Sequence, residues 1–193
     1  MIQWVGLAVV AIYAITYAVM MTRAAQFPAA AIGDALDGWP GERWLDVRSA
    51  EVRALMEARL DVAVTRGCDG VEPDNVDGYA NTTGFPLTAA DQLDYDRFLA
   101  TAAHARGLSV GLKNDLDQID DLVGAFDWAL DEECWAYDEC DLLDPFVAAG
   151  KAVFQVEYGA AGLADTVCPQ ANAKDFDTLI KNLDLDDWRV ACR

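Results

Sequence analysis

The sequence predicts an α/β protein built as a closed (β/α)8 barrel of the TIM type. Strand-like and helix-like segments alternate with short loops from residue 43 onwards, which indicates a parallel sheet, either open or closed into a barrel. An open nucleotide-binding sheet would carry a glycine-rich turn, and neither G-x-G-x-x-G nor G-x-x-x-x-G-K occurs in the chain. Five predicted strands end in polar residues, as strands do at the catalytic face of a barrel.

Strands and helices are predicted from hydrophobic periodicity and cap residues, after a proline- and glycine-rich loop around a short helix at residues 27–44. The strands are expected at residues 43–47, 69–75, 108–115, 127–134 and 151–159. The helices are expected at residues 49–67, 88–107, 116–126 and 137–150, and residues 167–185 form a last unit. Ser49 and Thr88 are the expected N-caps of the first two helices, and Gly67 and Gly107 are their stop signals.

Length and composition fit one globular domain. The chain has 193 residues, 53% of them apolar, which is enough to bury one core. Its 33 acidic and 14 basic residues give a formal net charge of −19. This charge repels phosphate backbones, so nucleic acid is not an expected partner, and it attracts metal ions, polyamines and amino sugars. An acidic, soluble surface explains the charge equally well.

Residues 1–21 carry no charged side chain and are mostly apolar. About 20 apolar residues can cross a bilayer, so membrane association through a membrane anchor is one interpretation. A cleavable signal peptide fits less well, because no basic residue precedes the apolar run and Arg23 follows it. A buried barrel strand with altered flanks is the third interpretation.

The carboxyl ends of the predicted strands are the place to look for a site, because barrel enzymes assemble their active sites there. The polar residues at these ends are Asp46 and Arg48; Glu72, Asp74 and Asn75; Lys113, Asn114 and Asp115; Asp131 and Glu132; Glu157 and Tyr158. Helix capping needs only one or two such residues, whereas carboxylates repeated at five strand ends indicate a shared polar cleft.

Glycoside hydrolysis is the chemistry that this pattern favours, because it needs two carboxylates held across a sugar-sized gap. In the segment GCDGVEPDNVDGY, strand alternation directs Glu72 and Asp74 to the same side, and Asn75 ends the strand. The single histidine, His104, lies in a predicted helix, so nucleophilic catalysis that depends on histidine is not expected. No cofactor is expected.

Four of the five cysteines fall into two local groups, Cys134 with Cys140 and Cys168 with Cys192. This spacing suits two disulfides in a secreted protein. Zinc is the alternative, but the chain has no Cys-x-x-Cys pair and one histidine, so no metal site is expected. Cys68 is left over as a free thiol.

Several motifs in order resemble the endo-α-1,4-polygalactosaminidases of glycoside hydrolase family 114. They are GWPGERWLDVR, GVEPDNVDGYANTTGFPLT, HARGLSVGLKNDLDQ, DEEC, YDEC and GKAVFQVEY, and the similarity runs from Phe27 to Cys192. The resemblance implies a secreted or extracellular barrel enzyme that cuts α-1,4-linked galactosamine polymers. Such a galactosamine-containing polysaccharide is cationic, which suits an acidic cleft.

The resemblance also implies roles for individual residues. The catalytic aspartate of the E-P-D-N motif falls on Asp74, expected as nucleophile or base, and the catalytic glutamate two residues before a cysteine falls on Glu132, expected as acid. The residues expected to bind sugar hydroxyls or amines are Glu72, Asn75, Tyr79, Lys113, Asn114, Asp115 and Glu157. The motifs predict neither retention nor inversion of configuration.

The N-terminal segment departs from the family pattern. Family members have an additional first strand unit, whereas residues 1–26 are a mostly apolar run without a clear strand pattern. We therefore expect residues 1–26 to be an altered barrel strand or a membrane anchor, and residues 27–193 to form a barrel whose first strand unit is missing or altered. Two functions stay open. One is a polygalactosaminidase, impaired by the altered front, and the other is a non-catalytic or degenerate barrel that binds cationic amino-sugar polymers.

Overall fold

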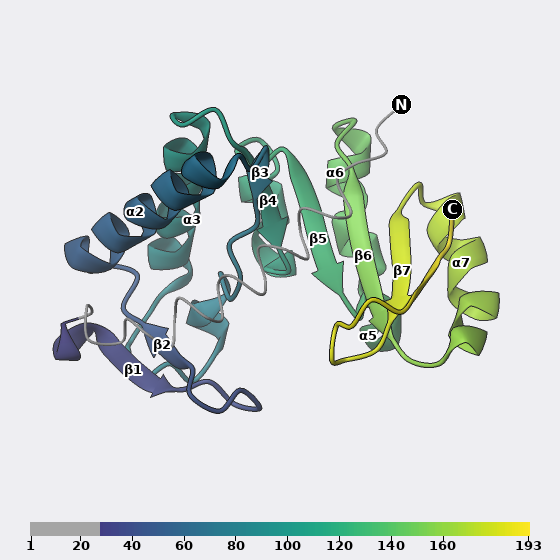
Figure 1. Cartoon of the computed structure of the whole chain (residues 1–193), viewed down its shortest axis with the longest axis horizontal. Helices are drawn as coiled ribbons and strands as arrows, with labels where there is room; N and C mark the ends of the chain where they lie inside the picture. The colour runs from purple at the N-terminus through teal and green to yellow at the C-terminus, as the bar shows by residue number, and fades with distance from the viewer. Residues whose placement is uncertain (1–27) are drawn as a thin grey trace. The chain divides into compact units, whose positions relative to one another are not determined.

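The structure is a computed structural model that describes residues 28–193, and the apolar segment expected at residues 1–26 lies outside this range. The chain divides into two compact units, with the boundary between Val110 and Gly111. Figure 1 colours the described chain from purple at its start to yellow at the C-terminus. Within residues 28–193, no helix combines the length and the apolar character needed to cross a membrane.

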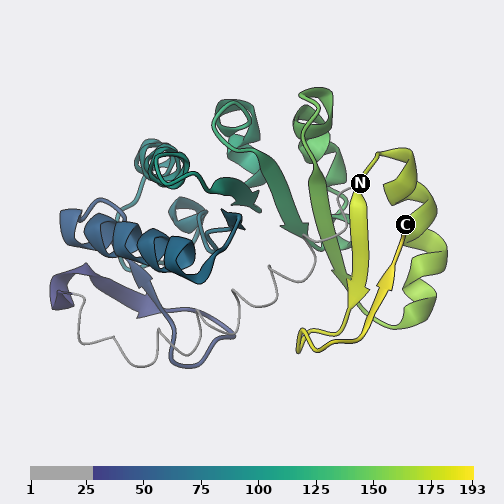
Figure 2. The same cartoon turned by 45° about the horizontal axis from the view of Figure 1, so that its top comes forward.

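The first unit combines an antiparallel hairpin, two long helices and a short parallel strand pair. Its elements are η2 (Ala29–Ala31), β1 (Ile32–Ala35), β2 (Arg43–Leu45), α2 (Ala50–Arg66), β3 (Gly70–Val71), η3 (Gly78–Ala80), α3 (Ala89–His104) and the start of β4 (Ser109–Lys113). β3 pairs in parallel with the start of β4. The helices α2 and α3 pack against each other, as both Figure 1 and Figure 2 show.

The strand predicted at residues 43–47 forms, but its pairing differs from that of a parallel barrel strand. β2 runs antiparallel to β1, with Ile32 opposite Leu45 and Ala35 opposite Arg43. The connection covers only residues 36–42, which is too short for the crossover that parallel strands require. The short helix expected in the preceding loop is reduced, within the described part of that loop, to the single 3-10 turn η2.

The caps of the two long helices confirm the sequence prediction. The Ser49 side chain accepts a hydrogen bond from Val52 N at the start of α2. Gly67 ends this helix with φ 77°, a left-handed conformation that costs glycine little. Thr88 and Asp91 form a reciprocal capping box at the start of α3. Local sequence therefore fixes where both helices begin.

The second unit is a parallel sheet with helices after its strands. Its strands are the end of β4, β5 (Trp128–Glu132), β6 (Val153–Tyr158), β7 (Asp177–Lys181) and β8 (Arg189–Ala191). Its helices are η4 (Leu116–Gln118), α4 (Ile119–Leu122), α5 (Cys134–Tyr137), η5 (Cys140–Leu143), α6 (Asp144–Ala148), η6 (Ala161–Leu163) and α7 (Ala164–Ala173). β4 to β7 pair in parallel in sequence order, and β8 returns antiparallel to β7. Consecutive parallel strands with helical crossovers build a (β/α) barrel, so the predicted α/β class is confirmed.

The helix predicted at residues 137–150 is wrong as one element, because the chain divides it between the end of α5, η5 and α6. Asp138 adopts φ 59°, which interrupts an α-helix, and the Cys134–Cys140 disulfide closes the chain around it. The helix predicted at residues 116–126 is likewise shortened to η4 and α4.

Both predicted disulfides are present. Cys134 is bonded to Cys140 in the segment that follows β5. Cys168, in α7, is bonded to Cys192, so the C-terminal segment after β8 is tied to that helix. Cys68, at intermediate exposure, belongs to neither bond.

The register of β4 to β7 sorts their side chains into two faces, since residues paired across a ladder point the same way. The helix face carries Leu112, Ala129, Asp131, Val153, Gln155, Glu157, Thr178 and Ile180, all at most 3% exposed. Backbone groups of α5 bond to this face, and α7 lies beside β7 in Figures 1 and 2. The opposite face, termed the glutamate face, carries Lys113, Leu130, Glu132, Val156, Tyr158 and Lys181.

Candidate functional site

Glu132, at the end of β5, is the centre of the polar residues on the glutamate face. Its Oε2 lies 3.1 Å from Lys113 Nζ, and its Oε1 accepts a hydrogen bond from the Tyr158 hydroxyl. The Lys113 side chain is 2% exposed, whereas that of Glu132 is 24% exposed. A buried ammonium needs a counter-charge, and Glu132 supplies one while part of its side chain stays open to solvent.

The end of β4 holds the backbone of Glu132 in place. Asn114 Oδ1 accepts a hydrogen bond of 3.0 Å from Glu132 N, and Asn114 N donates to Leu130 O at 2.9 Å. Asn114 and Asp115 adopt φ 49° and 45°, left-handed values that asparagine and aspartate tolerate better than most residues. Asparagine and lysine at the end of β4 therefore both act on Glu132, one through its backbone and one through its carboxylate.

Asp115 is placed differently from these two neighbours, since it is only 4% exposed and precedes η4. Two successive left-handed residues turn the chain sharply out of β4 at this point. Asp115 is one of the residues expected to bind sugar, and its burial leaves little of its side chain available to a ligand that arrives from solvent.

Glu157, also expected to bind sugar, lies on the helix face, opposite to the face that carries Glu132. It is 3% exposed, and its Oε1 accepts hydrogen bonds from Trp135 N at 2.9 Å and from Gln155 Nε2 at 2.7 Å. Burial raises the pKa of Glu157, although these hydrogen bonds act in the opposite direction. Its position beneath α5 follows from the alternation of β6.

Asp131 lies on the helix face next to Gln155 and is 1% exposed. Its Oδ1 accepts a hydrogen bond of 3.1 Å from Cys134 N. Burial, followed by the negative charge of Glu139, raises the pKa of Asp131 to about 8. This carboxyl group therefore carries a proton at neutral pH.

In the first unit, the acidic segment after β3 presents a carboxylate to solvent. Asp74 and Asn75 are exposed, whereas Glu72 and Tyr79 are partly buried. Asn75 adopts φ 57°, so the chain turns immediately after Asp74. Val76 is 3% exposed and anchors the segment to the core. The segment thus fixes an exposed aspartate on an otherwise anchored loop.

Glu42, just before β2, is a carboxylate near Asp74 that the sequence analysis missed. Burial and, to a smaller extent, the negative charge of Asp74 raise the pKa of Glu42. The hairpin of β1 and β2 brings the Glu42 carboxylate close enough to that of Asp74 for the two charges to interact. A lone glutamate in a proline- and glycine-rich loop gives no sequence signal of this proximity.

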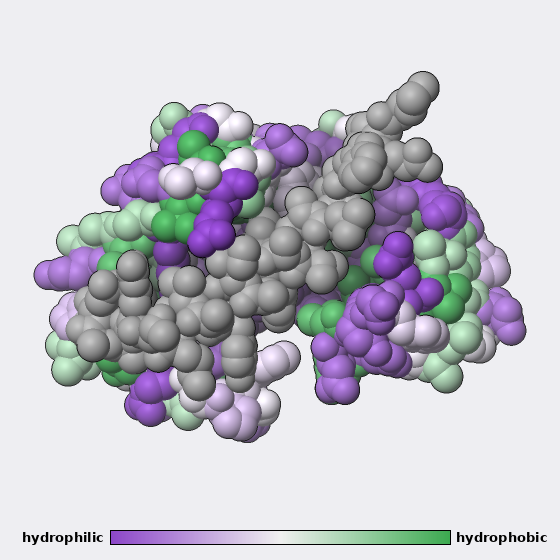
Figure 3. Space-filling view, viewed as in Figure 1, coloured by the Kyte–Doolittle hydropathy of each residue, from purple (hydrophilic) through white to green (hydrophobic). Residues whose placement is uncertain are grey.

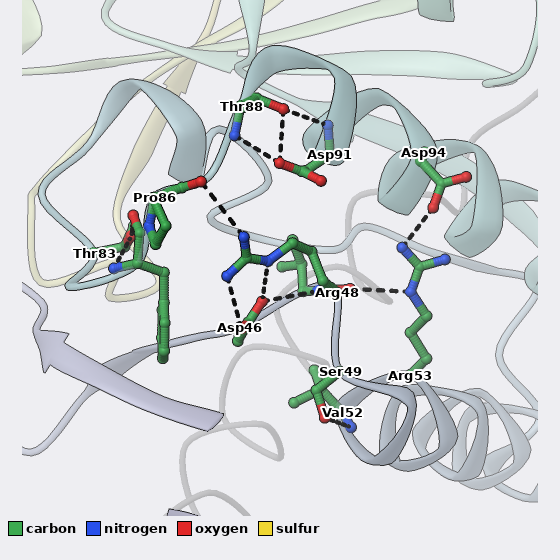
Figure 4. A network of polar contacts seen from close by, with 12 residues as sticks. Asp46, Arg48, Ser49, Val52, Arg53, Thr83, Pro86, Thr88, Asp91 and Asp94 are labelled. Carbon is green, nitrogen blue, oxygen red and sulfur yellow. Dashed lines mark hydrogen bonds and ion pairs between the residues drawn. The ribbon is translucent and has the colours of Figure 1, made fainter. Parts of the chain in front are cut away.

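Asp46 and Arg48, predicted as strand-end polar residues, form a link between elements of the first unit (Figure 4). The Arg48 guanidinium contacts the Asp46 carboxylate at 2.8 and 2.9 Å, and it reaches Pro86 O at 3.5 Å. The hydrogen bond from Arg48 lowers the pKa of Asp46. In the same view Arg53 of α2 meets Asp94 of α3 at 2.7 Å. These contacts join the start of α2 to α3 and to the loop that precedes α3.

Lys181, at the end of β7, is a second buried lysine on the glutamate face that the sequence analysis missed. It is 6% exposed, and its Nζ donates a hydrogen bond to the carbonyl oxygen of Asp186. The β7–β8 connection also exposes Asp184 and Asp187, and Figure 3 shows a mostly hydrophilic surface over it. The buried ammonium is thus capped by an acidic loop.

The predicted site residues fall into two groups in the described structure. Lys113, Asn114 and Glu132 are in direct contact in the second unit, joined by Tyr158. Glu72, Asp74, Asn75 and Tyr79 lie along one segment of the first unit. Between residues 28 and 193, no three or more histidine, cysteine, aspartate or glutamate side chains are grouped so as to hold a metal ion.

Comparison with known proteins agrees with these features. The model of glycoside-hydrolase family GH114 matches residues 8–193. The crystal structure of Aspergillus fumigatus Ega3 in complex with galactosamine is 43% identical in sequence, with a TM-score of 0.83 over 87% of this chain and 71% of that one. No curated protein sequence matches the chain.

Two more distant structures share the fold. The glycoside hydrolase domain of PelA from Pseudomonas aeruginosa is 15% identical, with a TM-score of 0.57 over 80% of this chain and 71% of that one. A variant of the same domain, also 15% identical, gives 0.59 over 92% of this chain and 76% of its own. At this identity the likeness concerns the fold alone.

Proposed function

The chain belongs to glycoside-hydrolase family GH114, and we propose that it is an endo-acting enzyme that hydrolyses α-1,4-linked galactosamine polymers. The observation that carries this proposal is the 43% identity to Ega3, whose crystal structure contains galactosamine. The formal net charge of −19 supports it, because an acidic protein attracts a polymer of ammonium-bearing sugars.

We propose Asp74 and Glu132 as the two catalytic carboxylates that glycoside hydrolysis requires. Glu132 is supported by its partial exposure and by Lys113 and Tyr158, which fix the direction of both its oxygens. Asp74 is supported by its exposure three residues after β3, on a loop anchored by a buried valine. We propose Asp74 as the nucleophile or base and Glu132 as the acid, an allocation that the resemblance of the motifs does not fix and that the second experiment below tests.

Asn75 and Tyr79 are the proposed sugar-binding neighbours of Asp74, since Asn75 is exposed and Tyr79 is partly exposed on the same segment. Lys113 and Asn114 act on the sugar through Glu132, whose carboxylate and backbone they hold. This division separates residues that touch the polymer from residues that orient the carboxylate.

The first experiment compares turnover of de-N-acetylated galactosaminogalactan by the wild type, Asp74→Asn and Glu132→Gln. Each substitution is expected to lower kcat at least about 1000-fold, because an amide neither exchanges the proton nor attacks the sugar carbon. Asp94→Asn and Glu57→Gln, exposed carboxylates on α3 and α2, are matched controls with wild-type turnover expected. A wild type that binds the polymer without cleaving it would establish the degenerate sugar-binding barrel instead.

A second experiment separates the roles of the two carboxylates with an aryl galactosaminide whose leaving group needs no protonation. If Glu132 is the acid, Glu132→Gln should cleave this substrate far better, relative to wild type, than it cleaves the polymer. Equal loss on both substrates would assign Glu132 as nucleophile or base.

We also propose that the enzyme acts outside the cell. The disulfides Cys134–Cys140 and Cys168–Cys192 support this, because such bonds persist in oxidising compartments. Fractionation of the producing cells tests it, and partition of the full chain between detergent-free buffer and membranes tests whether residues 1–21 act as an anchor.

A further inference from the structure

The segment that begins at Glu132 has its first two amide groups fixed by neighbouring strands. Glu132 N donates to Asn114 Oδ1 at 3.0 Å, so the end of β4 holds it from one side. Glu133 N donates to Val156 O at 2.8 Å, so β6 holds it from the other side. Glu133 itself adopts φ 68°, an uncommon conformation for glutamate that turns the chain from β5 into α5.

The next two amide groups are fixed by carboxyl groups from the helix face. Cys134 N donates to Asp131 Oδ1 at 3.1 Å, and Trp135 N donates to Glu157 Oε1 at 2.9 Å. Glu157 is itself held by Gln155 Nε2 at 2.7 Å. Asp131, Gln155 and Glu157 are all at most 3% exposed, so water does not compete for these bonds.

We propose that Glu157 is a positioning residue that holds the turn after Glu132 and thereby sets the direction of the Glu132 carboxylate. This inference rests on the proposed catalytic role of Glu132. It differs from the sequence-based expectation, in which Glu157 binds the sugar.

Glu157 and Tyr158 lie on opposite faces of the sheet. Tyr158 shares the glutamate face with Glu132 and touches its carboxylate directly, whereas the adjacent Glu157 points to the helix face. A side chain that is 3% exposed beneath α5 does not reach a polymer that arrives at the glutamate face. It does reach the backbone three residues after Glu132, and displacement of a catalytic group by about 1 Å lowers the rate by about 100-fold.

Kinetics of Glu157→Gln and Glu157→Met test the proposal. Glutamine keeps the oxygen that accepts from Trp135 N, so kcat should stay within about threefold of wild type. Methionine has a similar size without the acceptor, so kcat should fall about 10- to 100-fold with KM within about twofold of wild type. If Glu157 instead bound the ammonium groups of the sugar, Glu157→Gln would already raise KM, and that result would overturn the proposal, as would wild-type kcat in Glu157→Met.

Amide hydrogen exchange gives a readout that does not depend on catalysis. Glu157→Met should accelerate exchange in a peptide covering residues 133–137, while Glu157→Gln should leave most of its protection. Unchanged exchange in the methionine variant would contradict the positioning role even in a protein without activity. If the wild type does not turn over the polymer at all, the proposed function is wrong. The exchange measurement then still tests whether Glu157 holds the turn after Glu132.

Gln155→Met serves if Glu157→Met does not fold. It removes a hydrogen bond to Glu157 Oε1 and leaves the carboxyl group in place, so a smaller fall in kcat, about threefold, is expected. Glu57→Met, on the exposed side of α2, is the matched control for loss of a glutamate charge, with wild-type kinetics and exchange expected. A Gln155→Met variant with wild-type kcat and wild-type exchange would contradict the role of the Gln155–Glu157–Trp135 hydrogen bonds in holding this turn.

Discussion

In each unit a carboxylate near a strand end pairs with a cation, and the two cations lie in opposite surroundings. In the first unit, Asp46 pairs with Arg48, and the two side chains are 19% and 37% exposed. In the second unit, Glu132 pairs with Lys113, whose side chain is 2% exposed. An exposed pair exchanges its contact for water at little cost, whereas a buried ammonium has no such alternative. Similar sequence patterns therefore give a replaceable link in one unit and a required charge pair in the other.

The pKa shifts follow the same division. The Arg48 hydrogen bond lowers the pKa of Asp46, so the charged form is favoured there. Burial raises the pKa of Asp131 to about 8, so the neutral form is favoured. The hydrogen bond from a cationic partner decides the first case, and removal from water decides the second.

The largest contrast is expected when one partner of each pair is removed. Glu132→Gln should lower the free energy of unfolding by about 3 to 5 kcal/mol, because Lys113 loses a charged partner in a buried position. Asp46→Asn should lower it by less than about 1 kcal/mol. Denaturant unfolding of both variants measures the difference. A second change, Lys113→Met in the Glu132→Gln background, should restore most of the loss, and equal costs for the two single variants would abolish the contrast.

A comparable effect is expected from the pH dependence of Asp131. Its folded pKa of about 8 lies above the ordinary value of 3.8, so the folded state binds the proton more tightly than the unfolded state. Stability from this group is full below pH 4 and is lost as the pH rises towards 8. Asp131→Asn should remove this slope and raise stability at pH 8 by up to about 5 kcal/mol relative to wild type, because each unit of the pKa difference corresponds to about 1.4 kcal/mol.

Urea unfolding at pH 5 and pH 8 measures this slope in both proteins. Asparagine keeps the oxygen that accepts from Cys134 N, so the hydrogen bond itself is conserved. Parallel pH profiles for the wild type and Asp131→Asn would show that the carboxyl group is not the source of the slope.

The smallest effect concerns the Asp46–Arg48 pair. A double-mutant cycle with Asp46→Asn and Arg48→Met should give a coupling free energy below about 1 kcal/mol, which decreases further in 1 M salt. Because the folded pKa of Asp46 is lowered, its contribution is present above the unfolded pKa and disappears as the pH falls below it. A large coupling free energy that does not depend on salt would contradict the expected difference between the Asp46–Arg48 and Glu132–Lys113 pairs.

Local signals in the sequence account for much of the fold. Ser49, Gly67 and Thr88 fix helix ends because capping depends on only three or four neighbouring residues. The single helix expected at residues 137–150 fails because neither the left-handed Asp138 nor the constraint of the Cys134–Cys140 bond is visible in a hydrophobic pattern.

The candidate site was predictable in part. Glu132 and Lys113 are strand-end residues, but their ion pair depends on the register of β4 against β5, which sequence alone does not give. The position of Glu157 was within reach, since it and Tyr158 are adjacent in a strand and therefore point to opposite faces. Glu42 and Lys181 were missed because hairpin and sheet contacts bring them to their neighbours.

The disulfide ring from Cys134 to Cys140 begins two residues after Glu132 and links the enzyme's chemistry to its biosynthesis. A ring this small adds only about 2 kcal/mol of chain-entropy stabilisation, so the chain can fold without it while the loop after the proposed catalytic Glu132 is left unclosed. Material produced in a reducing cytosol would then stay folded with a lowered melting temperature and yet turn over slowly. The choice of expression compartment decides whether an activity measurement reports on this sequence or on its oxidation state.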